Sequence, residues 1–189
     1  MEHFEDGSNN VNLFESLKKV ERDLGRKLTP VERIILTTDG SITTILESLS
    51  GEKVNVRTVL QRVIKSDKEI SNSLSIREGS DVNERIVILE SKYPLVYAKS
   101  YTPLSILEPW FMDNIMKEDI PIGRIIRKLK MEIRRDLERI FMTNANRNIS
   151  KLLETQENER LISRSYLIFY KKKKLLHITE VFSPKINSF

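Results

Sequence analysis

Two strand-like runs near the C-terminal end constrain the fold of this chain more than any other feature. The runs Leu161–Tyr170 and Leu175–Phe182 are rich in apolar residues, and only the four lysines 171–174 separate them. Strands joined by so short a loop pair antiparallel, because parallel neighbours need a crossover of a dozen or more residues. The pattern therefore predicts a terminal hairpin in an antiparallel sheet.

Further strand patterns enlarge this sheet. Segments 84–90 and 95–102 flank Ser91-Lys92-Tyr93-Pro94 and predict a second antiparallel pair. Segment 54–59 alternates apolar and polar residues, as a half-buried strand does, and 133–142 also has the character of a strand. We therefore expect about five or six strands, several of them linked as hairpins.

Helices are predicted between these strands. Apolar residues at three- and four-residue steps predict an amphipathic helix that Gly25 ends, and Ser41 and Ser66 are candidate N-caps of later helices. The expected helices cover 11–24, 30–36, 42–49, 66–74, 107–116, 121–129 and 149–153. This order predicts an α+β fold, a mainly antiparallel sheet with helices inserted between strands, rather than alternating βαβ units.

The length and composition indicate one domain. The 189 residues, 39% of them hydrophobic, can bury one good core, and no repeat, low-complexity block or linker divides them. The first residues are polar, so we expect a flexible tail over 1–10 and a single domain over 11–189.

The composition also disfavours several kinds of function. No apolar stretch approaches the ~20 residues needed to cross a bilayer, and the N-terminus lacks the features of a signal peptide. We therefore expect a cytoplasmic protein without membrane contact. The chain has no cysteine and only two histidines, His3 and His177, so we expect no metal site built on these residue types. A magnesium site made of carboxylates alone stays open, but no pattern in the sequence marks one.

The charge of the chain indicates the chemistry of its partner. A formal net charge of +5 favours an anionic partner, and basic residues cluster at 124–135 and 171–174. Neither cluster carries interleaved aromatic residues or a nucleic-acid-binding motif. The charge alone does not choose between a small anion, a nucleic acid and an acidic membrane surface, but the missing motifs disfavour direct binding of nucleic acid. The oligomeric state stays open.

Two charged residues interrupt apolar strands and are candidates for chemistry. Arg85 precedes the apolar run Ile86–Leu89, where an inward-facing charge costs several kcal/mol unless an anion or partner meets it. Glu180 lies within the terminal strand in the same way. The alternatives are that Arg85 faces solvent, and that Glu180 is solvated or pairs across the hairpin with one of the lysines 172–174.

Two helix starts offer a different kind of group. A helix that begins at Pro121-Ile122-Gly123-Arg124 leaves backbone N–H groups for an anionic or carbonyl oxygen, and Gly123 lets a ligand approach the main chain. Ile42, in Ser41-Ile42-Thr43, begins another helix of this kind. The alternative is that Ile122 belongs only to the core.

These segments occur in the order and rough spacing of the chorismate pyruvate-lyase family, which the chain resembles over about Leu36 to Pro184. The resemblance implies that Arg85 binds a ring carboxylate and that Glu180 faces the ring oxygen opposite it. It also implies that Ile42, Ile122 and Gly123 line the pocket.

The activity implied by this resemblance is elimination of pyruvate from chorismate to give 4-hydroxybenzoate, without a metal or redox cofactor. The substrate is then a small dianion. Glu180 would act either as a buried acid that donates a proton to the departing enolpyruvyl group or as a group that only orients the substrate. Both hypotheses stay open at this point.

Two functions from other classes compete with the lyase. The family fold also serves the effector-sensing domains of a class of transcriptional regulators, which bind small ligands without reacting them. A sensor of this kind would need a partner that carries the DNA-binding domain. A noncatalytic module that binds through its basic face would instead show salt-dependent binding to nucleic acid.

Overall fold

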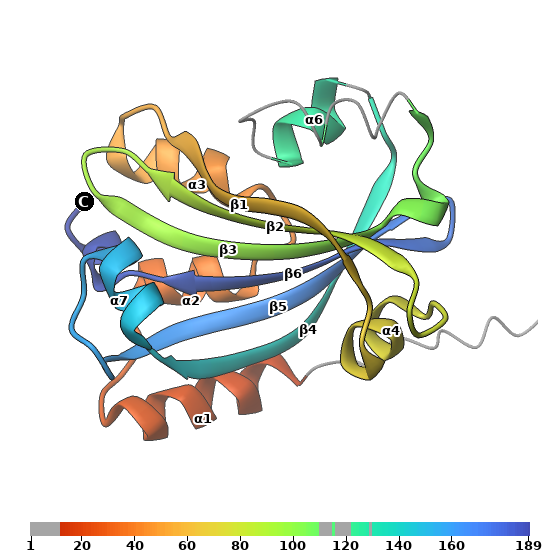
Figure 1. The fold of residues 1–189 in the computed structure, drawn as a ribbon. Coiled ribbons are helices and arrows are strands. Elements are labelled where there is room, and N and C mark those ends of the chain that lie inside the picture. Colours follow the sequence, from red (N-terminus) through yellow and green to blue (C-terminus); the bar gives the residue numbers. More distant parts are fainter. Residues whose placement is uncertain (1–11, 110–114, 116–121, 129) are drawn as a thin grey trace, which may run out of the picture.

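The computed structural model describes residues 12–109, 115, 122–128 and 130–189. In this part of the chain six strands form one antiparallel sheet in the order β1-β2-β3-β6-β5-β4 (Figure 1). The strands are β1 (Asn55–Lys65), β2 (Asp81–Glu90), β3 (Pro94–Pro103), β4 (Ile133–Asn144), β5 (Arg160–Tyr170) and β6 (Lys173–Phe182). The expected α+β fold on an antiparallel sheet is confirmed.

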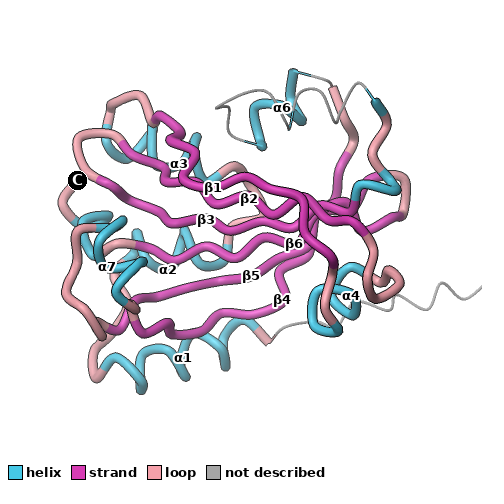
Figure 2. Tube along the Cα trace, in the orientation of Figure 1, coloured by secondary structure: helices cyan, strands magenta, loops and turns pink. Residues whose placement is uncertain are grey.

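The sheet consists of two halves, each made of strands that follow one another in the chain. The first three strands form one half and the last three form the other, so that only β3 and β6 pair across the middle (Figure 2). In that central pair Ala98 lies opposite Glu180. Residues far apart in the sequence therefore share the centre of the sheet.

Short helices cover both faces of this sheet. They are α1 (Leu13–Leu24), α2 (Pro30–Thr37), α3 (Ile42–Ser50), α4 (Lys68–Leu74), α6 (Ile122–Lys128) and α7 (Arg147–Leu153), with 3-10 turns η1 (Leu104–Ile106) and η2 (Pro184–Asn187). Helices α4 and α7 lie over one face, and α1, α2, α3 and α6 lie over the other (Figure 1).

The core follows this division. The largest apolar cluster joins α1, α2 and α3 to one face of the sheet, for example through Val20, Leu36 and Leu46, each at most 1% exposed. The opposite face packs Ile88 and Val181 against α7. Burial on both faces explains why β5 and β6 read as nearly continuous apolar runs.

Local signals set most helix ends as expected. Gly25 adopts a left-handed conformation, with φ of 70°, and ends α1, while the side chain of Ser41 caps α3. The cap of α4 is different: Asp67 accepts from the backbone N–H of Ile70, and the expected cap, Ser66, is buried and hydrogen-bonded to Ser71. The prediction of Ser66 as the cap was therefore wrong by one residue.

Two strand boundaries also differ from the prediction. Strand β1 runs six residues beyond Val59 to Lys65. Its register shifts between Thr58 and Leu60, and this irregularity breaks the alternation that marks a strand in sequence. At the terminal hairpin β6 already begins at Lys173, so the turn contains only Lys171 and Lys172, both with positive φ.

Some predictions fall on parts of the chain outside the described residues. These are the tail 1–10, Val11 at the start of the first helix, most of the helix 107–116, Pro121 and Leu129.

Candidate functional site

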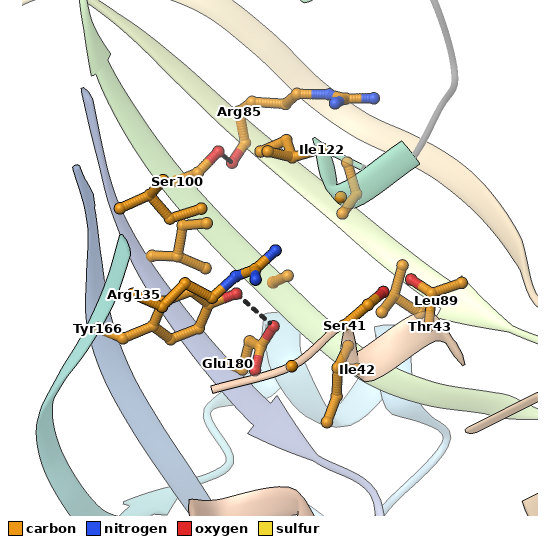
Figure 3. Close-up of a pocket in the computed structure, with 16 residues that line it drawn as sticks. Ser41, Ile42, Thr43, Arg85, Leu89, Ser100, Ile122, Arg135, Tyr166 and Glu180 are labelled. Carbon is orange, nitrogen blue, oxygen red and sulfur yellow. Dashed lines mark hydrogen bonds between the residues drawn. The ribbon is translucent and has the colours of Figure 1, made fainter. Parts of the chain in front are cut away.

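A cavity lies between the sheet and the first turns of α3 and α6. Alternating residues of the central strands form part of its wall, among them Arg85, Val87, Ala98, Tyr166, Ile178 and Glu180. Figure 3 shows Arg85, Tyr166 and Glu180 around the cavity. Residues 40–43 and Ile122–Gly123 form its rim. The cavity has about 590 Å³ of space between atoms, including its open mouth.

The register of the sheet places these side chains on one face. Arg85 lies opposite Ser100, and Glu180 lies opposite Ala98 two residues away on the same strand β3. Directly paired residues and residues two apart point to the same side of a sheet. Arg85 and Glu180 therefore reach one cavity although 95 positions separate them in the sequence.

Arg85 is buried at the cavity wall, with only 2% of its surface exposed. Its Nη2 donates to the Thr58 hydroxyl at 3.3 Å, and its backbone carbonyl accepts from the Ser100 hydroxyl at 3.5 Å. The alternative that Arg85 faces solvent is therefore wrong. A guanidinium at such a wall can offer parallel N–H donors to a carboxylate.

Glu180 is also buried, with 3% exposure, and both of its oxygens accept hydrogen bonds. Arg164 Nε donates to Oε2 at 2.7 Å. The Tyr166 hydroxyl donates to Oε1 at 3.0 Å, as Figure 3 shows. The alternative that Glu180 pairs with the lysines 172–174 is wrong, because its cross-strand partner is Arg164.

Arg164 and Tyr166 set the electrostatics of this carboxylate. Burial alone would lower the pKa of Arg164, but the charge of Glu180 raises that pKa above its usual value. Burial, followed by the charge of Glu180, raises the pKa of Tyr166 far above its usual value. Arg164 therefore stays charged and Tyr166 stays a neutral donor. Arg164 Nη1 also donates to the Thr38 carbonyl at 2.7 Å.

Neither Arg164 nor Tyr166 was recognised from the sequence. The available signal was their spacing, because residues two apart on β5 share a face and lie opposite β6. Using that signal required the correct hairpin register. A loop of four lysines would pair Tyr170 with Leu175 and place Ser165, rather than Arg164, opposite Glu180.

The two predicted helix starts meet at the rim of the cavity. A Cβ placed on Gly123 would lie 3.3 Å from the Ser41 hydroxyl oxygen, so glycine permits this close approach. Ile42, the first residue of α3, is buried, while Ile122, the first residue of α6, is half-buried, and both line the cavity. All five predicted site residues, Ile42, Arg85, Ile122, Gly123 and Glu180, therefore line one cavity. Backbone contact with a ligand stays a prediction.

Arg135 is a wall residue that sequence reasoning placed only within a basic cluster. It extends from β4 into the cavity between Arg85 and Glu180 (Figure 3). Its Nη1 donates to the Asp39 carbonyl at 3.1 Å. The cavity thus receives charged side chains from three strands, β2, β4 and β6.

The described residues provide neither a cluster of metal ligands nor a membrane-spanning helix. Within 12–109, 115, 122–128 and 130–189 no group of three or more histidine, aspartate or glutamate side chains could hold a metal ion. In the same ranges no helix has the length and apolarity needed to cross a membrane.

The chain matches one family model and a related protein, and both carry a lyase in their descriptions. The family model described as "Chorismate pyruvate-lyase Rv2949c-like" matches residues 36–189. A relative from Methanocaldococcus jannaschii, named "Putative lyase MJ0807", is 37% identical over 163 residues, which are 82% of this chain and 78% of that protein.

Solved structures resemble the fold at much lower identity. The effector domain of PhnF from Mycobacterium smegmatis has a TM-score of 0.66 and 11% identity, with 79% of this chain and 92% of that domain covered. A structure of PhnF itself has a TM-score of 0.67 and 12% identity over 79% of this chain and 66% of that chain. At these identities the likeness shows a shared fold alone.

Proposed function

This chain belongs to the Rv2949c-like chorismate pyruvate-lyase family, and from that membership we propose that it eliminates pyruvate from chorismate and leaves 4-hydroxybenzoate. One observation carries the proposal. A buried guanidinium, on Arg85, and a buried carboxylate, on Glu180, line the same cavity from different strands. A ligand with a carboxylate at one end and a hydroxyl at the other complements this pair.

The chemistry of chorismate explains what such a site must do. The ring carries a carboxylate at C1, an enolpyruvyl ether at C3 and a hydroxyl at C4. The C3–O bond breaks, the hydrogen on C4 leaves as a proton, and the C4–H electron pair completes the aromatic ring. The departing group gains one proton on its methylene carbon and becomes pyruvate. Because protons and electrons balance within the substrate, the site needs to hold and polarise it rather than supply an oxidant.

We assign each end of the substrate to one charged residue. Arg85 binds the ring carboxylate through its planar fork, as it is a permanently charged group. Glu180 accepts a hydrogen bond from the C4 hydroxyl, and Arg164 and Tyr166 hold the carboxylate in place at 2.7 and 3.0 Å. Such positioning of a reactive conformer lowers the barrier without a covalent intermediate.

The geometry favours this orienting role over proton donation by Glu180. Protonated Glu180 would leave the charge of Arg164 uncompensated in a site where Arg164 is 1% exposed. An uncompensated buried charge costs several kcal/mol. In this proposal Glu180 therefore remains an acceptor throughout the reaction.

Turnover of chorismate in EDTA, with pyruvate and 4-hydroxybenzoate followed by chromatography, tests the proposal. We expect product from the natural chain and roughly a 100-fold lower kcat/KM for Arg85→Ala, since losing one side of a buried charged contact costs about 2–5 kcal/mol. Arg57→Ala is the matched control, because Arg57 is half-exposed on β1 and pairs with Glu90. Equal losses in both variants would contradict the assignment of Arg85.

The second candidate is a ligand-sensing domain that performs no reaction, and the shared fold with the PhnF effector domain favours it. Such a domain gains thermal stability from 4-hydroxybenzoate or chorismate but releases no pyruvate. Stabilisation without product would therefore reject the lyase and leave the sensor.

A further inference from the structure

The contacts described so far pair Arg135 with a backbone carbonyl and not with a carboxylate. Glu180, the carboxylate of the cavity wall, is already paired with Arg164 at 2.7 Å. Among the described residues no carboxylate oxygen lies within 4.0 Å of a guanidinium nitrogen of Arg135. A cation that lines a cavity without such a partner can attract an anion.

The guanidinium of Arg135 is held in position rather than loose. Its Nη1 donates to the Asp39 carbonyl at 3.1 Å, just before the first turn of α3. Its Nη2 lies 3.9 Å from the position that a Cβ on Gly123 would occupy. The side chain is also close enough to Tyr166 for its charge to oppose the rise of that phenol's pKa. These contacts place the group at the wall, with Nη2 toward the rim.

The position of the Arg135 guanidinium relative to Arg85 and Glu180 indicates which part of the proposed substrate it would contact. In the view of Figure 3 the Arg135 guanidinium lies between Arg85 and Glu180, and all three residues line the cavity. In the proposed binding mode Arg135 would therefore lie beside a ring whose ends are held by the other two. In chorismate the ether at C3 extends sideways from the ring and carries the second carboxylate. A cation beside the ring therefore faces the side of the substrate that leaves.

We propose that Arg135 binds the second carboxylate of the substrate, on the departing three-carbon group, and so makes the cavity selective for dianions. This inference rests on the proposed function and names the residue that distinguishes substrate from product. The product 4-hydroxybenzoate has one carboxylate, so it keeps the contacts with Arg85 and Glu180 but has no group for Arg135. Arg135 therefore contributes to substrate binding and not to retention of product.

A binding experiment with unreactive probes tests this role. The dianion 3-(1-carboxyvinyloxy)benzoate carries both carboxylates on an aromatic ring, and benzoate carries one. For Arg135→Gln we expect at least a tenfold weaker dianion affinity and a benzoate affinity within twofold of the natural chain, measured by calorimetry. Arg85→Ala should weaken both probes, because both carry the ring carboxylate.

Arg134→Gln is the matched control. Arg134 is the neighbour of Arg135 on β4, is 61% exposed, pairs with Asp136 at 2.8 Å and stacks on Phe169. The substitution Arg134→Gln removes the same charge from the opposite face of the strand. The affinities for both probes should therefore stay within twofold of those of the natural chain. If Arg134→Gln reduced dianion affinity as much as Arg135→Gln, a general field effect would replace the proposed contact.

The binding measurements and the chorismate assay together distinguish the role of Arg135 from the lyase activity. Unchanged dianion affinity in Arg135→Gln, or equal losses for both probes, would overturn the role of Arg135 even if chorismate is turned over. Selective loss of the dianion in a chain that makes no pyruvate would reject the lyase and retain the dianion site. Arg135→Lys keeps a point charge and should recover part of the dianion affinity, which also covers a glutamine variant that fails to fold.

Discussion

Arg164 and Glu180 form a buried ion pair on neighbouring strands, and each compensates the charge of the other. Arg164 is 1% exposed and Glu180 is 3% exposed, at a separation of 2.7 Å. Removal of one partner leaves the other charged and without compensation. Replacement of both by apolar groups avoids this penalty.

This pair leads to a prediction about stability. Arg164→Met should lower the free energy of unfolding by about 3–5 kcal/mol, whereas Arg164→Met/Glu180→Leu should lower it by much less. Urea denaturation followed by circular dichroism measures both values. Equal destabilisation of the single and the double variant would show that packing, not charge compensation, dominates at this position.

At the scale of single residues, the sequence marked Arg85 and Glu180 but not Arg135 as members of the site. A charged residue in an apolar strand marked Arg85 and Glu180 as unusual, yet pattern alone did not decide whether either faced solvent. The family resemblance supplied that decision. Arg135 carried no comparable signal, because its position at the cavity depends on how β4 and the segment before α3 pack together.

At the scale of single elements, the start of α2 is the best-defined local structure. The Thr29 hydroxyl accepts from the Glu32 backbone N–H, and Glu32 accepts in return from the Thr29 N–H, as in a capping box. Burial would raise the pKa of Glu32, but Arg26, the Thr29 N–H and Asn187 together hold it below its usual value.

This cap predicts how stability depends on pH. A carboxyl whose pKa is lower in the folded than in the unfolded chain contributes stability above its unfolded pKa of about 4.3, and the contribution disappears as pH falls through the folded pKa. Stability should therefore decline below about pH 4–5, and Glu32→Gln should flatten that decline.

Thermal unfolding between pH 7 and pH 3 measures the effect. Glu15→Gln is the control, since Glu15 is an exposed residue of α1 that pairs only with Lys18 in the described part of the chain. A parallel decline in Glu32→Gln and the natural chain would contradict the role assigned to Glu32.

The terminal hairpin shows where element prediction succeeded and where it failed. Both strands and their pairing were evident from two apolar runs beside a short loop. The register was not, because Lys171 and Lys172 adopt positive φ and β5 and β6 shift register between Ile168 and Phe169. Positive φ is usual for glycine and asparagine in such turns, so a lysine pair gave no indication of a two-residue turn.

At the scale of the whole molecule, ligand binding should stabilise the fold by mass action. With 4-hydroxybenzoate at 100 times its Kd, the free energy of unfolding should rise by about 2.7 kcal/mol. Arg85→Ala should reduce this gain at the same ligand concentration, because the carboxylate contact is lost. A full gain in Arg85→Ala, measured by urea denaturation, would place the ligand elsewhere.

The fold as a whole was more predictable than the site. Hairpins are local in sequence, and two predicted pairs sufficed to indicate an antiparallel α+β domain. The central pairing of β3 with β6 joins segments about 80 residues apart and left no trace in sequence pattern. The site depends on that pairing, so its composition beyond the residues of the resemblance was accessible only from the structure.

The pairing of β3 with β6 at the centre of the sheet affects the kinetics of folding. Arg85 comes from the first three strands, and Glu180 and Arg135 come from the last three, so neither half of the sheet alone contains the binding site. The site is complete only after β3 has paired with β6, which has the largest sequence separation of the strand pairings. Closing so long a segment carries a high cost in chain entropy. A transition state that lacks this contact has no affinity for the ligand. A bound ligand should therefore slow unfolding and leave the rate of folding unchanged.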